Sequence, residues 1–132
     1  MTRFFALALG LSACSNPSQT YLDEARDLWA ASGPTDYSYH VVYGCFCPEM
    51  AADVVVTAGT ADVTQVGQED VDSRWTSGIP AVYDAIQATI DDHPDSLSVS
   101  YENGVPTSIS VDPIANAIDD EWGVTISEFT AL

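Results

Sequence analysis

Cys45 and Cys47, one residue apart, are the pair in this sequence best suited to carry chemistry. In a regular strand, residues two apart point the same way, with their Cβ atoms about 6–7 Å apart, whereas a disulfide needs about 3.5–4.5 Å. A bridge therefore requires a bend, which Gly44 and Pro48 on either side would permit. The spacing leaves four interpretations open: a bridge that fixes the end of a strand, a redox-active pair, a soft-metal site, or two buried reduced thiols.

The soft-metal interpretation would add Met50 and His40 to the two thiolates, a ligand set suited to Cu(I) or Zn(II). The redox interpretation needs a thiol with a lowered pKa, and no basic residue lies close by in the sequence to lower it. Two cysteines alone are also a weaker metal signal than paired Cys-x-x-Cys knuckles. We therefore expect no cofactor, with copper or zinc at Cys45 and Cys47 as the alternative.

A second group of candidate ligands is acidic and lies near the end of the chain. Asp112, Asp119, Asp120 and Glu121 could hold Ca²⁺, because hard cations prefer several oxygen ligands. The group lacks the spacing of an EF-hand loop and has no glycine at the turn. In a chain with 20 acidic residues carboxylates also gather by chance, so a solvated loop is the competing interpretation.

None of the familiar arrangements of catalytic residues occurs in the sequence. Serines are plentiful, but no Gly-x-Ser-x-Gly stretch is present and no His–Asp spacing suggests a triad. His40 and His93 are isolated, and paired carboxylates are too common here to indicate glycosidase chemistry. Tyr37, Tyr39 and Tyr43 could line a binding groove or form the half-buried face under a helix. We predict a binding or interaction protein that is not an enzyme. The alternatives are a thiol or copper-handling protein built on Cys45 and Cys47, and a calcium-dependent module of the cell envelope.

The charge of the chain excludes several kinds of partner. Its 132 residues contain 3 Lys and Arg together against 20 Asp and Glu, a net charge of −17 at pH 7. Such a surface repels nucleic acid and anionic lipid, so we expect no nucleic-acid partner. The acidity indicates either adaptation to high salt or a genome that avoids lysine codons together with selection for solubility.

The candidate residues are positioned by elements that the apolar periodicity predicts. In chain order these are a helix at 20–32, a strand at 36–47, a hairpin of 53–57 and 62–66, a helix at 79–90, a hairpin of 97–101 and 109–111 across Asn103-Gly104, and a strand at 124–129. Gly67–Ser77 is predicted to be an acidic loop that contains Trp75, and 112–122 to be irregular or briefly helical. The order αβββαβββ predicts an α+β fold, with an antiparallel sheet of five to six strands and two helices on one face.

The N-terminus predicts export and a lipid anchor. Arg3 precedes an apolar run that is too short to span a bilayer, which needs about 20 residues. Leu11-Ser12-Ala13-Cys14 resembles the lipobox of bacterial lipoproteins, in which the cysteine takes a diacylglycerol and becomes the new N-terminus. We therefore expect a signal peptide at 1–13, a lipidated Cys14 and tether at 14–19, and one α+β domain at 20–132.

The resemblance extends beyond the lipobox. Tyr37-Ser38-Tyr39, Cys45-Phe46-Cys47 and Asp119-Asp120-Glu121, in this order, are similar to motifs of an uncharacterised family of bacterial lipoproteins, a domain of unknown function. The resemblance covers nearly the whole mature chain and implies a place in the cell envelope, without implying an activity. We expect the protein in the outer membrane, facing the periplasm, if the host has two membranes. Its partner would be the membrane through Cys14, together with an unknown envelope protein or small ligand.

Overall fold

The computed structural model of the protein describes residues 16–132, where the chain forms three helices and six strands. The elements are α1 (Pro17–Ser32), β1 (Tyr37–Gly44), β2 (Met50–Thr57), β3 (Thr60–Gln65), α2 (Ser73–Thr76), α3 (Ile79–Asp91), β4 (Ser96–Glu102), β5 (Val105–Asp112) and β6 (Trp122–Ala131). The predicted α+β order αβββαβββ is confirmed, with the single turn α2 added before α3. No helix in the described part is both long and apolar enough to cross a membrane.

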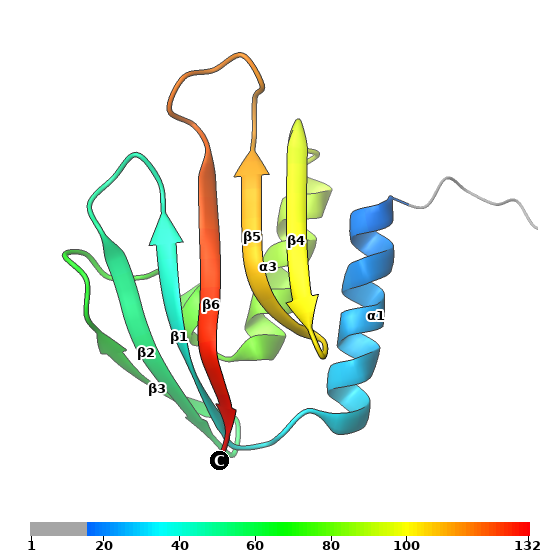
Figure 1. Ribbon diagram of the computed structural model, residues 1–132, viewed down its shortest axis with the longest axis vertical. Helices are drawn as coiled ribbons and strands as arrows, with labels where there is room; N and C mark the ends of the chain where they lie inside the picture. The colour runs from blue at the N-terminus through cyan, green and yellow to red at the C-terminus, as the bar shows by residue number, and fades with distance from the viewer. Residues whose placement is uncertain (1–15) are drawn as a thin grey trace, which may run out of the picture.

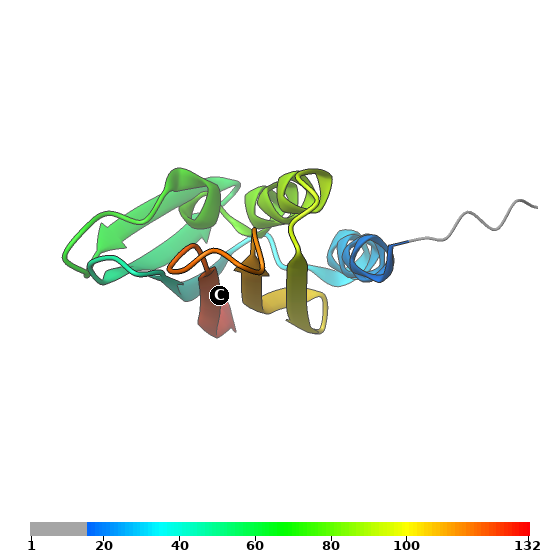
Figure 2. The ribbon, with the colours of Figure 1, turned by 90° about the horizontal axis from the view of Figure 1, so that it is seen from above.

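All six strands belong to one antiparallel sheet with the order β3-β2-β1-β6-β5-β4. The last strand of the chain, β6, lies between β1 and β5 and so joins the two three-stranded halves (Figure 1). α3 crosses one face of the sheet, and α1 packs against α3 and the edge strand β4 on that side (Figure 2). Within residues 16–132 no helix lies over the opposite face.

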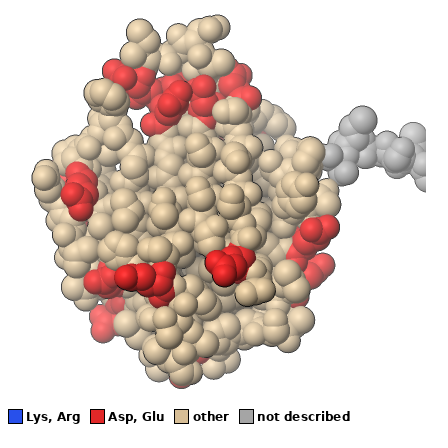
Figure 3. Space-filling model, in the orientation of Figure 1, with Lys and Arg blue, Asp and Glu red and all other residues tan. Residues whose placement is uncertain are grey.

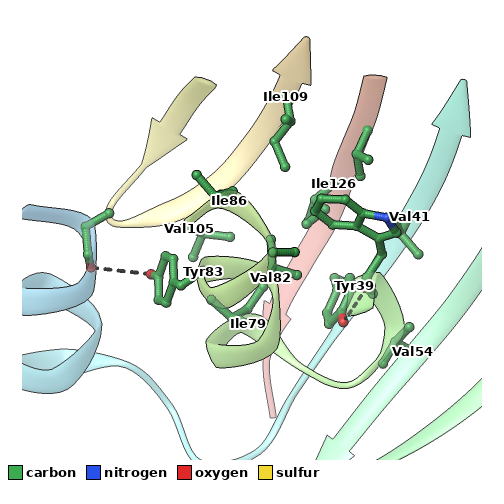
Figure 4. Packing of buried hydrophobic residues seen from close by; sticks show 14 of the residues in the cluster. Tyr39, Val41, Val54, Ile79, Val82, Tyr83, Ile86, Val105, Ile109 and Ile126 are labelled. Carbon is green, nitrogen blue, oxygen red and sulfur yellow. Dashed lines mark hydrogen bonds between the residues drawn. The ribbon is translucent and has the colours of Figure 1, made fainter. Parts of the chain in front are cut away.

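The two faces of the sheet have different side chains because alternate residues point to opposite sides. The side chains that point toward the helices are buried in the core: Tyr39, Val41, Val54, Val105, Ile109, Val124 and Ile126. Figure 4 shows part of this core. On the other side hydroxyl groups predominate: Ser38, Thr64, Ser98, Ser100, Ser108, Ser110, Thr125 and Ser127. Figure 3 shows this uncovered face, where carboxylates lie mainly toward the ends of the strands and no lysine or arginine is seen.

Two tight turns connect neighbouring strands as the sequence predicts. Asn103 and Gly104 have φ of 51° and 83°, and Ala58 and Gly59 have φ of 48° and 81°. Positive φ at both central residues matches the right-handed twist of the flanking strands, and asparagine and glycine adopt it most readily. At Gly104 the carbonyl oxygen also receives the Tyr83 hydroxyl at 2.5 Å, and the same hydroxyl lies 3.3 Å from the carbonyl of Ala25 in α1 (Figure 4).

Two sequence predictions about the loops are wrong. The predicted strand continues to residue 47, whereas β1 ends at Gly44 and the chain bends through Cys45 and Cys47. The predicted loop around Trp75 contains the turn α2, and the Trp75 side chain is only 1 % exposed. The Asp72 carboxylate caps this turn by accepting from the Arg74 amide at 2.9 Å, so the acidic residues stay outside while the indole enters the core.

Tyrosine hydroxyls take the place of a side-chain cap at the start of α3. Gly78 precedes the helix and has no side chain to accept from its first amides. The Tyr39 hydroxyl accepts from the Gly78 amide at 3.1 Å and donates to the Trp75 carbonyl at 2.9 Å, and the Tyr37 hydroxyl accepts from the Ile79 amide at 2.9 Å. Burial raises the pKa of both phenols, so each hydroxyl stays protonated at neutral pH. These two tyrosines therefore belong to the buried face of the sheet under the helices.

Removing the Tyr39 hydroxyl should destabilise the fold. Tyr39→Phe leaves the Gly78 amide and the Trp75 carbonyl buried without a partner, which costs about 1–3 kcal/mol of unfolding free energy. Urea unfolding followed by tryptophan fluorescence measures the change. Tyr21→Phe, at an exposed tyrosine of α1, is the matched control and should leave the midpoint in place. Equal midpoints for both variants would show that the Tyr39 hydroxyl does not cap α3.

Candidate ligand-binding pocket

Cys45 and Cys47 are joined as a disulfide in the bend that follows β1. Their Cα atoms are 5.1 Å apart, a separation that the bend between Gly44 and Pro48 makes possible. The Phe46 side chain between them is 84 % exposed. The bridge therefore fixes the end of a strand at the surface, and a bonded pair presents no thiolate to a metal ion.

The other two residues of the predicted soft-metal set lie apart from each other. Met50 is opposite Tyr43 in the β1–β2 ladder and packs against the core. His40 lies on the uncovered face, where its Nδ1 atom is 2.7 Å from Oδ1 of Asp53. The structure does not bring Met50 and His40 together. His40, which is isolated in the sequence, instead pairs with Asp53.

The four carboxylates of the predicted calcium group lie at the end of β5 and in the loop that follows it. Asp112 ends β5, and Asp119, Asp120 and Glu121 lie in the loop before β6. The Asp120 carboxylate accepts from the Ile114 amide at 3.1 Å and so holds the loop. One oxygen of Asp112 and one of Asp120 are buried without a hydrogen-bond partner. Within residues 16–132, however, no three of these side chains bring ligand oxygens within 4.8 Å of one another, and calcium binding here stays a prediction.

The sheet opens between β5 and β6. Their ladder runs from Val111 opposite Trp122 to Ser108 opposite Thr125, and there it ends. Beyond this point β5 bends away with β4, whereas β6 continues along β1 to Ala131 (Figure 1). Two strands that are neighbours at one end of the sheet thus diverge at the other.

A pocket of about 480 Å³ lies where these strands diverge. Its apolar side comes from residues of α1, β5 and β6: Trp29, Val105, Ile126 and Phe129. Its polar side consists of Ser32, Glu102, Asn103, Thr107, Ser127 and Glu128, and Gly33 and Pro34 after α1 complete it. This volume lies within the range of about 300–1,000 Å³ that is typical of small-molecule sites.

Trp29 is held in the pocket wall by other aromatic rings. Its ring centroid lies 5.0 Å from that of Tyr37 and 6.0 Å from that of Phe129, both edge to face. The end of α1 packs closely on the indole, because a Cβ atom on Gly33 would lie 2.6 Å from the ring. The Gly33 amide donates to the Trp29 carbonyl at 2.7 Å. The indole is therefore fixed in orientation while remaining partly accessible.

A β-bulge in β6 places the remaining side chains of the wall. Ser38 pairs with Thr130 and His40 with Ser127, so Glu128 and Phe129 together face a single residue of β1. Glu128 has φ of 55°, the left-handed conformation that an extra residue in a strand often takes. The bulge resets the alternation, so that Phe129 packs inward and Glu128 lies at the rim of the pocket.

The charged side chains that line the pocket are all negative. Glu102 and Glu128 stand at its rim, and no lysine or arginine is among its lining residues. The two arginines of the described part bind elsewhere: Arg26 pairs with Asp84 and Arg74 with Asp72, each at 3.0 Å. An aromatic surface beside two carboxylates suits a ligand that has both an apolar body and a positive charge.

Sequence reasoning missed this pocket and most of the residues that form it. The divergence of β5 and β6 depends on strand order, which no local pattern reveals. The bulge did leave a signal: Ile126 and Phe129 are three residues apart in a strand whose apolar residues otherwise alternate.

The comparison with protein families supports one part of the resemblance, a domain of unknown function; the lipobox lies outside the matched residues. The family described as Family of unknown function (DUF6174) matches residues 21–131. The chain belongs to this family. The match to DUF6174 covers every strand of the sheet and α1 from Tyr21 onward. No curated protein and no solved structure matches the chain. The match establishes the family of the domain. Because this family has no known function, the match implies no activity for the chain.

Reduction of the Cys45–Cys47 bridge should have a small effect on stability. The oxidised chain should be two daltons lighter than the reduced chain in a mass spectrum. Because the bridge closes a very short loop, its removal lowers the unfolding free energy by about 2 kcal/mol or less. Thermal unfolding with and without reductant measures this, with Cys45→Ser/Cys47→Ser as the control. Loss of the folded state on reduction would instead mean that the bend organises the sheet.

Proposed function

We propose that this protein is a lipid-anchored component of the bacterial cell envelope that binds a small ligand in the pocket between β5 and β6, without catalysis. The observation that carries the proposal is the pocket itself, in which Trp29 and Phe129 lie beside Glu102 and Glu128. The lining residues within 16–132 include no histidine, cysteine or lysine, and we infer that the hydroxyl and carboxylate groups of the pocket serve as contacts for a ligand.

The envelope location rests on the N-terminal sequence. Leu11-Ser12-Ala13-Cys14 has the pattern of a lipobox, and it falls outside the residues that the structure describes. The family match begins at residue 21, seven residues after Cys14, which would keep the domain close to the membrane. A surface with so few basic residues gains nothing from anionic lipid, so the acyl chains would have to supply the attachment.

The ligand that fits best is an organic amine. An ammonium group near an indole face gains about 0.5–2 kcal/mol from the cation–π interaction. Glu102 and Glu128 add direct attraction, and the net charge of −17 raises the concentration of cations near the surface. The apolar residues Val105, Ile126 and Phe129 favour an amine with a hydrocarbon or aromatic body over a fully hydrated one.

The anchor is tested by fractionation. Cys14→Ala should move the protein from the membrane fraction to the soluble fraction, because the acceptor of the lipid is gone. Cys45→Ser is the matched control, since it removes a cysteine outside the lipobox and should leave the protein with the membrane. An unchanged membrane fraction for Cys14→Ala would contradict lipid anchoring and leave the pocket untouched.

The ligand class is tested with two molecules of similar shape and opposite charge. Titration of the protein with 2-phenylethylamine should change the tryptophan fluorescence, whereas phenylacetate should not bind. Glu102→Gln and Glu128→Gln should each weaken amine binding about three- to tenfold, equivalent to about 0.7–1.4 kcal/mol.

Glu69→Gln removes the same charge from an exposed residue outside the pocket and should leave the affinity unchanged. Equal weakening in all three variants would mean that only the net charge attracts the amine. Binding of phenylacetate as tight as that of the amine would exclude the cation site.

A further inference from the structure

We propose that His40, Asp53 and Glu128 form a binding site for a divalent transition-metal ion of the zinc class on the uncovered face of the sheet. The three residues come from β1, β2 and β6, which are adjacent in the sheet. This site is additional to the amine pocket and shares only Glu128 with it.

The three side chains converge closely. One ligand atom from each lies within 4.8 Å of those from the other two, and among residues 16–132 this is the single such group of histidine, cysteine and carboxylate side chains. His40 is directly opposite Asp53 in the β1–β2 ladder, and their Nδ1 and Oδ1 atoms are 2.7 Å apart. Paired strands, in place of a mobile loop, thus set the separation of the imidazole and its first carboxylate.

The second carboxylate is present because of the bulge in β6. In a regular strand, with Ile126 facing the core, residue 128 would face the core as well. The extra residue turns Glu128 to the uncovered face, at the side of His40 that lies away from Asp53. Bulges commonly re-aim a side chain in this way.

The donor set identifies the class of ion. An imidazole nitrogen with two carboxylate oxygens suits Zn²⁺ and its neighbours in the transition series, whereas Ca²⁺ and Mg²⁺ prefer oxygen alone. Four ligands at about 2.0–2.2 Å from zinc lie about 3.3–3.6 Å from one another. His40 and Asp53 would therefore separate by less than about 1 Å, as the ion replaces the proton between them.

The surroundings leave the site open to an ion. The side chain of His40 is 26 % exposed and that of Asp53 57 % exposed, so water can reach the remaining coordination positions. Both described arginines pair with other aspartates, and neither neutralises Asp53 or Glu128. Two carboxylates together balance the charge of a divalent cation.

Isothermal titration calorimetry with Zn²⁺ tests the proposal, on the full chain solubilised in mild detergent and stripped with a chelator. One Zn²⁺ should bind per chain in 0.15 M salt. His40→Asn, Asp53→Asn and Glu128→Gln should each weaken binding at least about tenfold, since even outer-shell partners of metal sites have effects of that size. Ca²⁺ at the same concentration should give no comparable heat.

His93→Asn is the matched control, because it removes the second of the two histidines from an exposed position far along the sequence. Unchanged Zn²⁺ binding in His40→Asn, or an equal loss in His93→Asn, would overturn the site. Loss of Zn²⁺ binding in Cys45→Ser/Cys47→Ser with retention in His40→Asn would place the ion at the thiols instead. His40→Asn should still bind 2-phenylethylamine, so failure of the metal site and failure of the pocket are separate results.

Discussion

The pairing of β6 with two strands that diverge is the constraint on which the rest of the structure depends. β6 follows β1 over the length of both strands but stays with β5 only from Trp122 to Thr125. The sheet therefore opens at one end, and the end of α1 fills part of the opening with Trp29. The opening between β5 and β6 creates the pocket. It also removes ladder hydrogen bonds between the two strands, and aromatic packing at the opening has to offset their loss.

Aromatic side chains serve two purposes in this fold. Tyr37 and Tyr39 are buried against the helices, and their hydroxyls accept from the amides of Gly78 and Ile79 at the start of α3, where Gly78 has no side chain to act as a cap. The Tyr37 ring also lies against Trp29, which borders the pocket. One row of residues on β1 therefore links the start of α3 to the pocket wall. Tyr37 and Tyr39 are too buried to contact a ligand themselves. Tyr37 can act on the pocket only indirectly, by holding the Trp29 ring in place.

The sequence contained most of the fold because its local patterns are strong. The alternation in β1, β4 and β5 and the Asn103-Gly104 turn predicted strands and a hairpin that the structure confirms. The site was hidden for physical reasons. The pairing of His40 with Asp53 joins residues of two strands through their register, and Glu128 and Phe129 depend on a bulge that one unusual spacing indicates. Trp75 looked like a loop residue because the acidic residues around it obscure its role in the core.

Glu128 connects the two proposed sites physically. The same carboxylate stands at the rim of the pocket and within reach of His40 and Asp53. An ion held by Glu128 would take from the pocket one of its two negative charges, and an amine held by Glu128 would take from the metal site one of its three ligands. Each ligand would then lower the affinity for the other by the same factor, because coupling between two binding equilibria is reciprocal. Because the bulge places Glu128 in both proposed sites, binding of the metal ion and binding of the amine would compete.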